Sequence, residues 1–191
     1  MSEAAGSGTE DPALPAYAGP VERRRFRRIK LGLFLSSMAA CLGVTLLGIA
    51  STAMIRLSLG LAGAANHYEL FGGNSFVNGA SGGALLAAYN FFLFFITVPA
   101  AWLALGLSIG RFPYRGIVAR KPYVRWATIW GAILVGGTTG LFGFLSGPLH
   151  GLGALFSGVL IGASAGAVCG LLFYAIVKPA NQLSDVDVSV F

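Results

Sequence analysis

The chain of 191 residues is 55% hydrophobic and only 10% charged, and its 13 Lys and Arg against 7 Asp and Glu give a net charge of +6. Because about a quarter of the residues in soluble domains are charged, this composition excludes an ordinary water-soluble globular protein. The positive charge does not indicate a nucleic-acid partner, since the basic clusters border long apolar runs and are better explained by orientation in a membrane and attraction to anionic headgroups.

The chain begins with a polar segment, residues 1–22, that is rich in Gly, Ala, Pro, Ser and acidic side chains. A segment with so little apolar surface cannot form a packed core, so we predict a disordered cytoplasmic tail. The membrane domain is expected to follow at residues 23–178, and residues 179–191 are expected to form a second cytoplasmic tail.

Four apolar runs without Asp, Glu, Lys, Arg or His lie within this domain, at residues 31–55, 84–110, 126–145 and 155–177. Each reaches the roughly 20 residues that an α-helix needs to cross the hydrocarbon core of a bilayer. The predicted fold class is therefore all-α, a polytopic membrane protein with four transmembrane helices.

The basic residues predict the orientation of these helices, because 12 of the 13 flank the same end of the runs. Lys and Arg in short flanks are retained on the cytoplasmic side, which places both termini inside and the basic side chains at anionic lipid headgroups. Arg56 alone follows the other end of a run, where we interpret it as an interfacial anchor. The residues expected at the cytoplasmic headgroups are Arg23, Arg24, Arg25, Arg27, Arg28, Arg111, Arg115, Arg120, Lys121 and Arg125.

The two outer connections differ in length. Residues 57–83 form a long Gly-rich connection in which Asn78-Gly79 is a turn signal, whereas about nine residues around His150 join the third and fourth runs. His67, Glu69 and His150 all fall in these connections, and imidazole with carboxylate is a usable metal ligand set. No motif spacing supports a metal, so we interpret all three as hydrated loop residues and predict no metal site.

Two residues interrupt the uniform character of the second run. Pro99 removes one helical hydrogen bond and predicts a kink near residues 95–99. Asn90 is the only carboxamide in any run, so it must find a hydrogen bond, either between helices or along a solute path. No cofactor is predicted, and a bound lipid, quinone or pigment stays open.

The strongest pattern is a glycine every fourth residue in the last run, at Gly158, Gly162, Gly166 and Gly170. Such a glycine zipper lets another helix backbone approach closely. Candidate counterparts in the third run are Gly136, Gly140 and Gly143. The pattern predicts tight packing of the third and fourth helices, within one chain or between subunits.

These features favour a noncatalytic integral membrane subunit, an assembly factor or a scaffold within a larger membrane complex, whose partners are other membrane proteins or a second copy. The alternative is a homo-oligomeric channel or facilitator for a small solute, since a passive pore needs no buried charge. No catalytic constellation is present, so we do not expect an enzyme. A bacterial inner membrane is favoured over the alternative of an organelle membrane.

Overall fold

The computed structural model describes residues 29–62, 75–115 and 117–179. Within these ranges the regular secondary structure is entirely helical, and no strand is present. Four helical stretches are long and apolar enough to cross a membrane, namely Ile29–Leu61, Phe76–Leu107, Arg120–Phe144 and Pro148–Val177. The expectation of an all-helical chain with four candidate spans is therefore confirmed.

The helices extend beyond most of the predicted boundaries. Helix α1 (Ile29–Leu61) continues past residue 55, and α6 (Pro148–Val177) begins before residue 155. Counting charge-free residues finds only the part of a helix that hydrocarbon surrounds, whereas backbone hydrogen bonding continues the helix through the interface. The nine-residue connection expected between the last two spans is consequently reduced to residues 145–147, where Gly147 has a φ of 136° that favours glycine.

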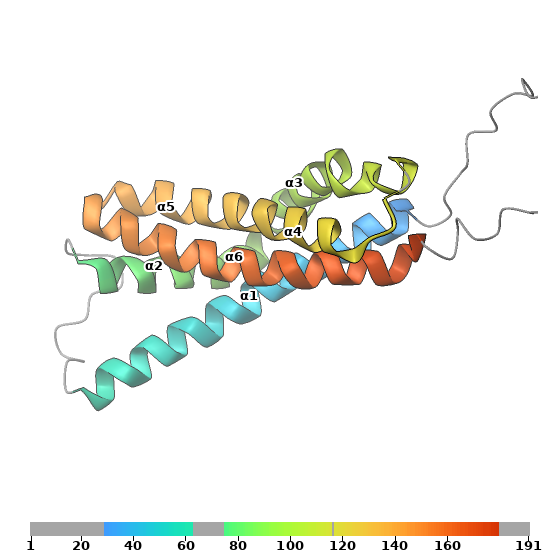
Figure 1. Ribbon diagram of the computed structural model, residues 1–191. Helices are drawn as coiled ribbons and strands as arrows, with labels where there is room; N and C mark the ends of the chain where they lie inside the picture. The colour runs from blue at the N-terminus through green and yellow to red at the C-terminus, as the bar shows by residue number, and fades with distance from the viewer. Residues whose placement is uncertain (1–28, 63–74, 116, 180–191) are drawn as a thin grey trace, which may run out of the picture.

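The second span is built from three consecutive segments. Helix α2 (Phe76–Ala88) begins at Ser75, whose hydroxyl accepts a hydrogen bond of 3.2 Å from the Asn78 backbone N–H. Asn78 and Gly79 therefore lie inside a helix and do not form a turn, because this N-cap starts the helix just before them. A 3₁₀ segment, η3 (Tyr89–Leu93), follows α2, and the chain leaves it in a different direction as α3 (Phe94–Leu107) (Figure 1).

The third span also changes its helical type along its length. Two short 3₁₀ turns, η4 (Ile109–Arg111) and η5 (Pro113–Arg115), lead from α3 towards α4 (Arg120–Gly131). A π-helical turn, η6 (Ala132–Gly136), then joins α4 to α5 (Gly137–Phe144). The continuous α4–η6–α5 rod lies antiparallel to α6 (Figure 1).

Helix α6 occupies the centre of the bundle. It packs against α1, α2, α4, η6 and α5, so all three earlier spans contribute a contact to it. Glycines allow these close approaches, because a Cβ at Gly153 would contact the Phe76 carbonyl oxygen and one at Gly79 would contact the His150 carbonyl oxygen. Helix α6 thus touches α2 on one side and the α4–η6–α5 rod on another.

An aromatic cluster closes one end of the bundle. The Tyr123 ring lies 5.3 Å from the Phe112 ring and 5.9 Å from the Phe173 ring, measured between centroids. The Tyr123 hydroxyl donates a hydrogen bond of 2.7 Å to the Ile117 carbonyl oxygen, which fixes the start of α4 against the preceding connection. The start of α1, the η4–η5 turns, the start of α4 and the end of α6 meet at this end of the bundle (Figure 1). The exposed basic residues of these segments are Lys30, Arg111, Arg115, Arg120, Lys121, Arg125 and Lys178.

Candidate functional site

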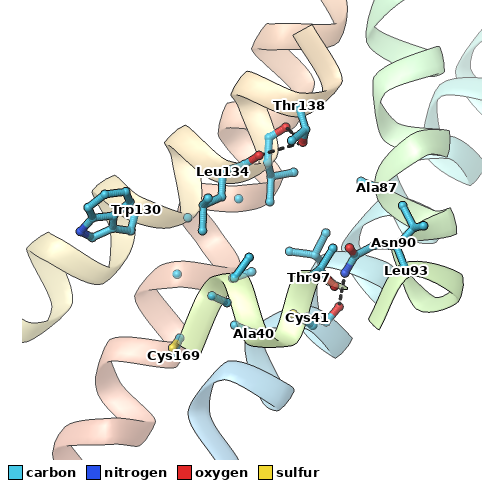
Figure 2. A pocket seen from close by; sticks show the side chains of 18 of the residues that line it. Ala40, Cys41, Ala87, Asn90, Leu93, Thr97, Trp130, Leu134, Thr138 and Cys169 are labelled. Carbon is cyan, nitrogen blue, oxygen red and sulfur yellow. Dashed lines mark hydrogen bonds between the residues drawn. The ribbon is translucent and has the colours of Figure 1, made fainter. Parts of the chain in front are cut away.

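A cavity of about 340 Å³ lies in the interior of the bundle. All four spans contribute to its lining: Ala40 and Cys41 from α1, Asn90 from η3, Trp130 from α4 and Cys169 from α6 (Figure 2). The cavity is half-enclosed and almost entirely apolar. It is the type of concave, mostly apolar site with a few polar groups in which small molecules bind.

The polar corner of the cavity is formed by Cys41, Asn90 and Thr97. The Asn90 amide nitrogen donates a hydrogen bond of 3.3 Å to the Cys41 carbonyl oxygen, a contact that links η3 to α1 (Figure 2). This carbonyl also accepts a hydrogen bond of 3.2 Å from the Thr45 hydroxyl. Asn90 therefore has the interhelical hydrogen bond that an amide in a membrane span requires.

Thr97 is unusual among the hydroxyl residues of these helices. Ser108 and Thr138 donate to carbonyl oxygens one helical turn earlier, at 2.8 Å in both cases. The Thr97 hydroxyl is buried beside the Cys41 thiol, which is only a weak acceptor, and within the described residues it has no hydrogen bond of good geometry. Because an unsatisfied buried hydroxyl is costly, this atom is a candidate for contact with a ligand.

The opposite wall carries Trp130, Leu134 and Thr138. The Thr138 hydroxyl donates to the Leu134 carbonyl oxygen, so its hydrogen is occupied while its oxygen can still accept. The indole nitrogen of Trp130 is buried and has no partner in the part of the chain that the structure describes. In Figure 2 this nitrogen points away from Asn90, so the ring, and not its N–H group, forms the wall.

The local helix geometry explains why a cavity forms here. The 3₁₀ segment η3 turns the second span, and α3 consequently leaves the direction of α2 (Figure 1). On the facing rod, the π-helical turn η6 places Leu134 and Val135 along the cavity. A π-turn widens a helix locally and is often found at functional sites.

The predicted packing glycines come together along the contact between α6 and the α4–η6–α5 rod, where Gly162 and Gly166 also border the cavity. A Cβ added to Gly158 would contact the Thr139 hydroxyl oxygen, one at Gly162 would contact the Gly131 carbonyl oxygen, and one at Gly166 would contact the Ala127 carbonyl oxygen. At Gly170 the added Cβ would lie 2.8 Å from the Tyr123 carbonyl oxygen. This glycine row (Gly158, Gly162, Gly166 and Gly170) therefore lies directly against the α4–η6–α5 rod.

The glycines predicted on the third span face α6 in turn. An added Cβ at Gly136 would contact a Val159 methyl group, at Gly140 it would lie 2.9 Å from Leu155 Cβ, and at Gly143 2.6 Å from Ala154 Cβ. The Thr139 hydroxyl adds a polar contact of 3.0 Å to the Ala154 carbonyl oxygen. Helices α5 and α6 are thus joined by close backbone approach and by one interhelical hydrogen bond.

Other predicted residues lie apart from the cavity. Pro99 lies inside α3 and is exposed, while the described 3₁₀ segment η3 precedes it, so a kink at Pro99 itself stays a prediction. His150, expected in a hydrated loop, instead lies in the first turn of α6 and is only 2% exposed. That expectation was wrong because α6 begins at Pro148, and close packing of Gly79 on the His150 backbone buries this turn.

The residues that lie outside the described ranges include His67, Glu69, Arg23, Arg24, Arg25, Arg27 and Arg28, together with residues 1–22 and 180–191 of the two predicted tails. Among the residues that the structure does describe, no three His, Cys, Asp or Glu side chains are grouped as metal ligands. The sequence alone drew no attention to Thr97, and it indicated an interfacial aromatic residue at Trp130, with no role in a cavity. The only available signal was their position on the spans that carry Asn90 and the zipper counterparts.

The fold defines a class of protein. Four long apolar helices in one bundle are compatible with a multi-pass integral membrane protein. Comparisons with protein-family models, with curated proteins and with solved structures found no match to this chain. The function must therefore be argued from the bundle and its cavity.

Proposed function

We propose that this protein is a noncatalytic membrane subunit, assembly factor or scaffold that acts through helix–helix packing. The glycine row supports this proposal as an internal glycine zipper, because its four positions lie against the α4–η6–α5 rod of the same chain. Close backbone contact of this kind gains dispersion that lipid tails cannot match. The zipper would then hold α6 against the α4–η6–α5 rod, and the outer surfaces of this bundle would be free to contact the partner protein.

The observation that carries the proposal is the poor coverage of the second span. Only 6% of the residues in its most apolar stretch are buried, against 33%, 28% and 39% in the first, third and fourth spans. Within α3, only Ala104 and Leu105 are buried. Exposed side chains such as Phe95 and Leu103 are available for a partner helix, so we propose α3 as the partner-facing surface.

We further propose that both termini face the cytoplasm, with a bacterial inner membrane as the favoured location. The starts of α1 and α4 and the end of α6 lie at the same end of the bundle (Figure 1). These segments carry Lys30, Arg120, Lys121, Arg125 and Lys178, whereas Arg56 lies in the last part of α1. The positive-inside rule assigns the more basic end to the cytoplasm.

Photocrosslinking tests the partner-facing surface. A photoreactive amino acid is placed at Leu103 on α3, which is 57% exposed, and separately at Val168 on α6, which is 55% exposed. We expect Leu103 to crosslink to one defined polypeptide in native membranes and Val168 to crosslink mainly to lipid. Equal crosslinking from both positions, or none to protein from either, would contradict the assignment.

A homo-oligomeric channel or facilitator for a small neutral solute is the second candidate. Asn90, Thr138 and Thr139 support it, because they give the cavity polar groups without a charge. Solute flux into liposomes separates the two candidates. Flux that disappears in an Asn90→Leu variant would favour the channel, and a homo-oligomeric crosslink from Leu103 would agree with it.

A further inference from the structure

The cavity combines hydrocarbon-like walls with a single polar corner. Leu93 and Ile96 line one side, and Leu134, Val135 and Phe142 line the other. None of the described residues that line it is Asp, Glu, Lys, Arg or His. A charged headgroup would lose its hydration here without meeting an opposite charge, so the lining selects against ions, phosphates and carboxylates.

The polar corner defines the group that fits. Because the Asn90 amide nitrogen donates to the Cys41 carbonyl oxygen, the amide orientation is fixed and its oxygen is left as an acceptor on the side away from that carbonyl (Figure 2). The Thr97 hydroxyl supplies a donor without a hydrogen bond of good geometry among the described residues. A hydroxyl group can donate to Asn90 and accept from Thr97 at once, whereas a carbonyl group can only accept.

The outer side of the cavity is accessible from the membrane. Leu93 is 48% exposed, Ile96 56% and Phe142 59%, and all three line the cavity. Because these lining side chains also face outward, the partly open cavity is reached from the lipid-facing surface of the bundle. A molecule can therefore enter it laterally from the lipid phase. At about 340 Å³, the cavity lies near the lower end of the roughly 300–1,000 Å³ typical of ligand sites.

We propose that this cavity binds a neutral lipid with one free hydroxyl group on a mostly hydrocarbon body. The hydroxyl lies at Asn90 and Thr97, the adjoining hydrocarbon packs on Trp130, Leu134 and Ile96, and the remainder extends into the bilayer. The cavity shares α3 with the proposed partner-facing surface, because Ile96 and Thr97 line it, so the two proposals are tested by separate measurements.

Tryptophan fluorescence provides the test, because Trp130 lines the cavity. The full chain carrying Trp102→Phe and Trp126→Phe is placed in lipid vesicles, so that Trp130 is the reporter. A dibrominated long-chain alcohol is the probe, since bromine quenches a tryptophan that it contacts. We expect quenching that saturates with alcohol concentration and exceeds the quenching by dibrominated phosphatidylcholine at the same mole fraction.

Two near-isosteric variants locate the hydroxyl. Thr97→Val and Asn90→Leu should each weaken binding of the alcohol by roughly three- to tenfold, the worth of one net hydrogen bond. We expect Thr97→Val to leave the fold intact, because the hydroxyl it removes makes no hydrogen bond of good geometry to a described group. The matched control is Thr128→Val, which removes a hydroxyl that donates to the Val124 carbonyl oxygen outside the cavity lining.

Ala40→Phe places a ring in the cavity and should abolish the saturable component. Three results would overturn the proposal: no saturable quenching by the alcohol, quenching equal to that by the brominated phosphatidylcholine, or unchanged binding in both Thr97→Val and Asn90→Leu. The first result would instead favour occupation of the cavity by a helix of another subunit.

Discussion

Replacing Gly162 by alanine should force α6 away from the α4–η6–α5 rod. The new Cβ would contact the Gly131 carbonyl oxygen and would lie 2.8 Å from both the Gly131 carbonyl carbon and Val135 Cβ. Ordinary van der Waals contact begins at 3.4 Å, so the atoms must separate by at least 3.4 − 2.8 = 0.6 Å. Backbone is the main obstacle, so a change of side-chain rotamer cannot relieve the clash.

Overpacking of this kind typically costs about 1–3 kcal/mol, and we expect a value in the upper half of that range for Gly162→Ala. Gly158, Gly166 and Gly170 lie along the same helix contact and lose dispersion when the helices part. Gly162→Leu adds further carbon atoms at the same point. It should therefore lower the yield of folded protein as well as its stability.

The measurement is the free energy of unfolding in mixed micelles, titrated with SDS and followed by helical circular dichroism. Gly137→Ala is the matched control, because a Cβ at Gly137 meets nothing within 4 Å. This control should leave the unfolding free energy unchanged or raise it by up to about 1 kcal/mol. A Gly162→Ala protein within about 0.5 kcal/mol of the wild type would refute the close helix contact. Normal folding of Gly162→Leu with loss only of an assembly would place the zipper between subunits.

Three further predictions use the same preparations. Thr139→Val removes the hydrogen bond to the Ala154 carbonyl oxygen and should lower the unfolding free energy by roughly 0.6 kcal/mol, with about 1.7 kcal/mol as the upper limit; increased stability in the SDS titration would contradict this. Ser81→Ala should leave stability unchanged or raise it, because the buried Ser81 hydroxyl has no described partner; a marked loss would reveal one. With both native cysteines changed to alanine, a membrane-impermeant maleimide on intact cells should label Ser58→Cys but not Lys178→Cys, and the reverse pattern would refute the proposed orientation.

The four spans were predictable because bilayer hydrocarbon imposes a simple requirement, a long run of residues without charge. Their ends were not, because helices continue through the interface under local control. Helix α2 begins at Phe76, after the Ser75 cap, which is eight residues before residue 84, where the charge-free run was expected to begin. Helix α6 begins at Pro148, directly after Gly147. His150 was misplaced for this reason, since its side chain lies in a buried helical turn.

The site was only partly predictable. Asn90 could be recognised because it is the only carboxamide in any of the four predicted apolar runs. Its neighbours in the cavity could not, because Thr97 and Trp130 are ordinary residues of membrane helices. They line one cavity only because η3 redirects α3 and because η6 widens the facing rod. Interruptions of helical geometry of this type leave no clear periodic signal in the sequence.

The central position of α6 also bears on how the protein is made. Synthesis proceeds from the N-terminus, so α6 is the last of the four spans to leave the ribosome. Until it does, α1, α2 and the α4–η6–α5 rod lack the helix on which each of them packs, and the backbone faces of Gly79 and Gly131 have no partner. Although α1 already contacts α2 and α3, we expect the earlier spans to be only loosely associated until α6 is inserted. We therefore expect closure of the bundle to follow insertion of this one helix.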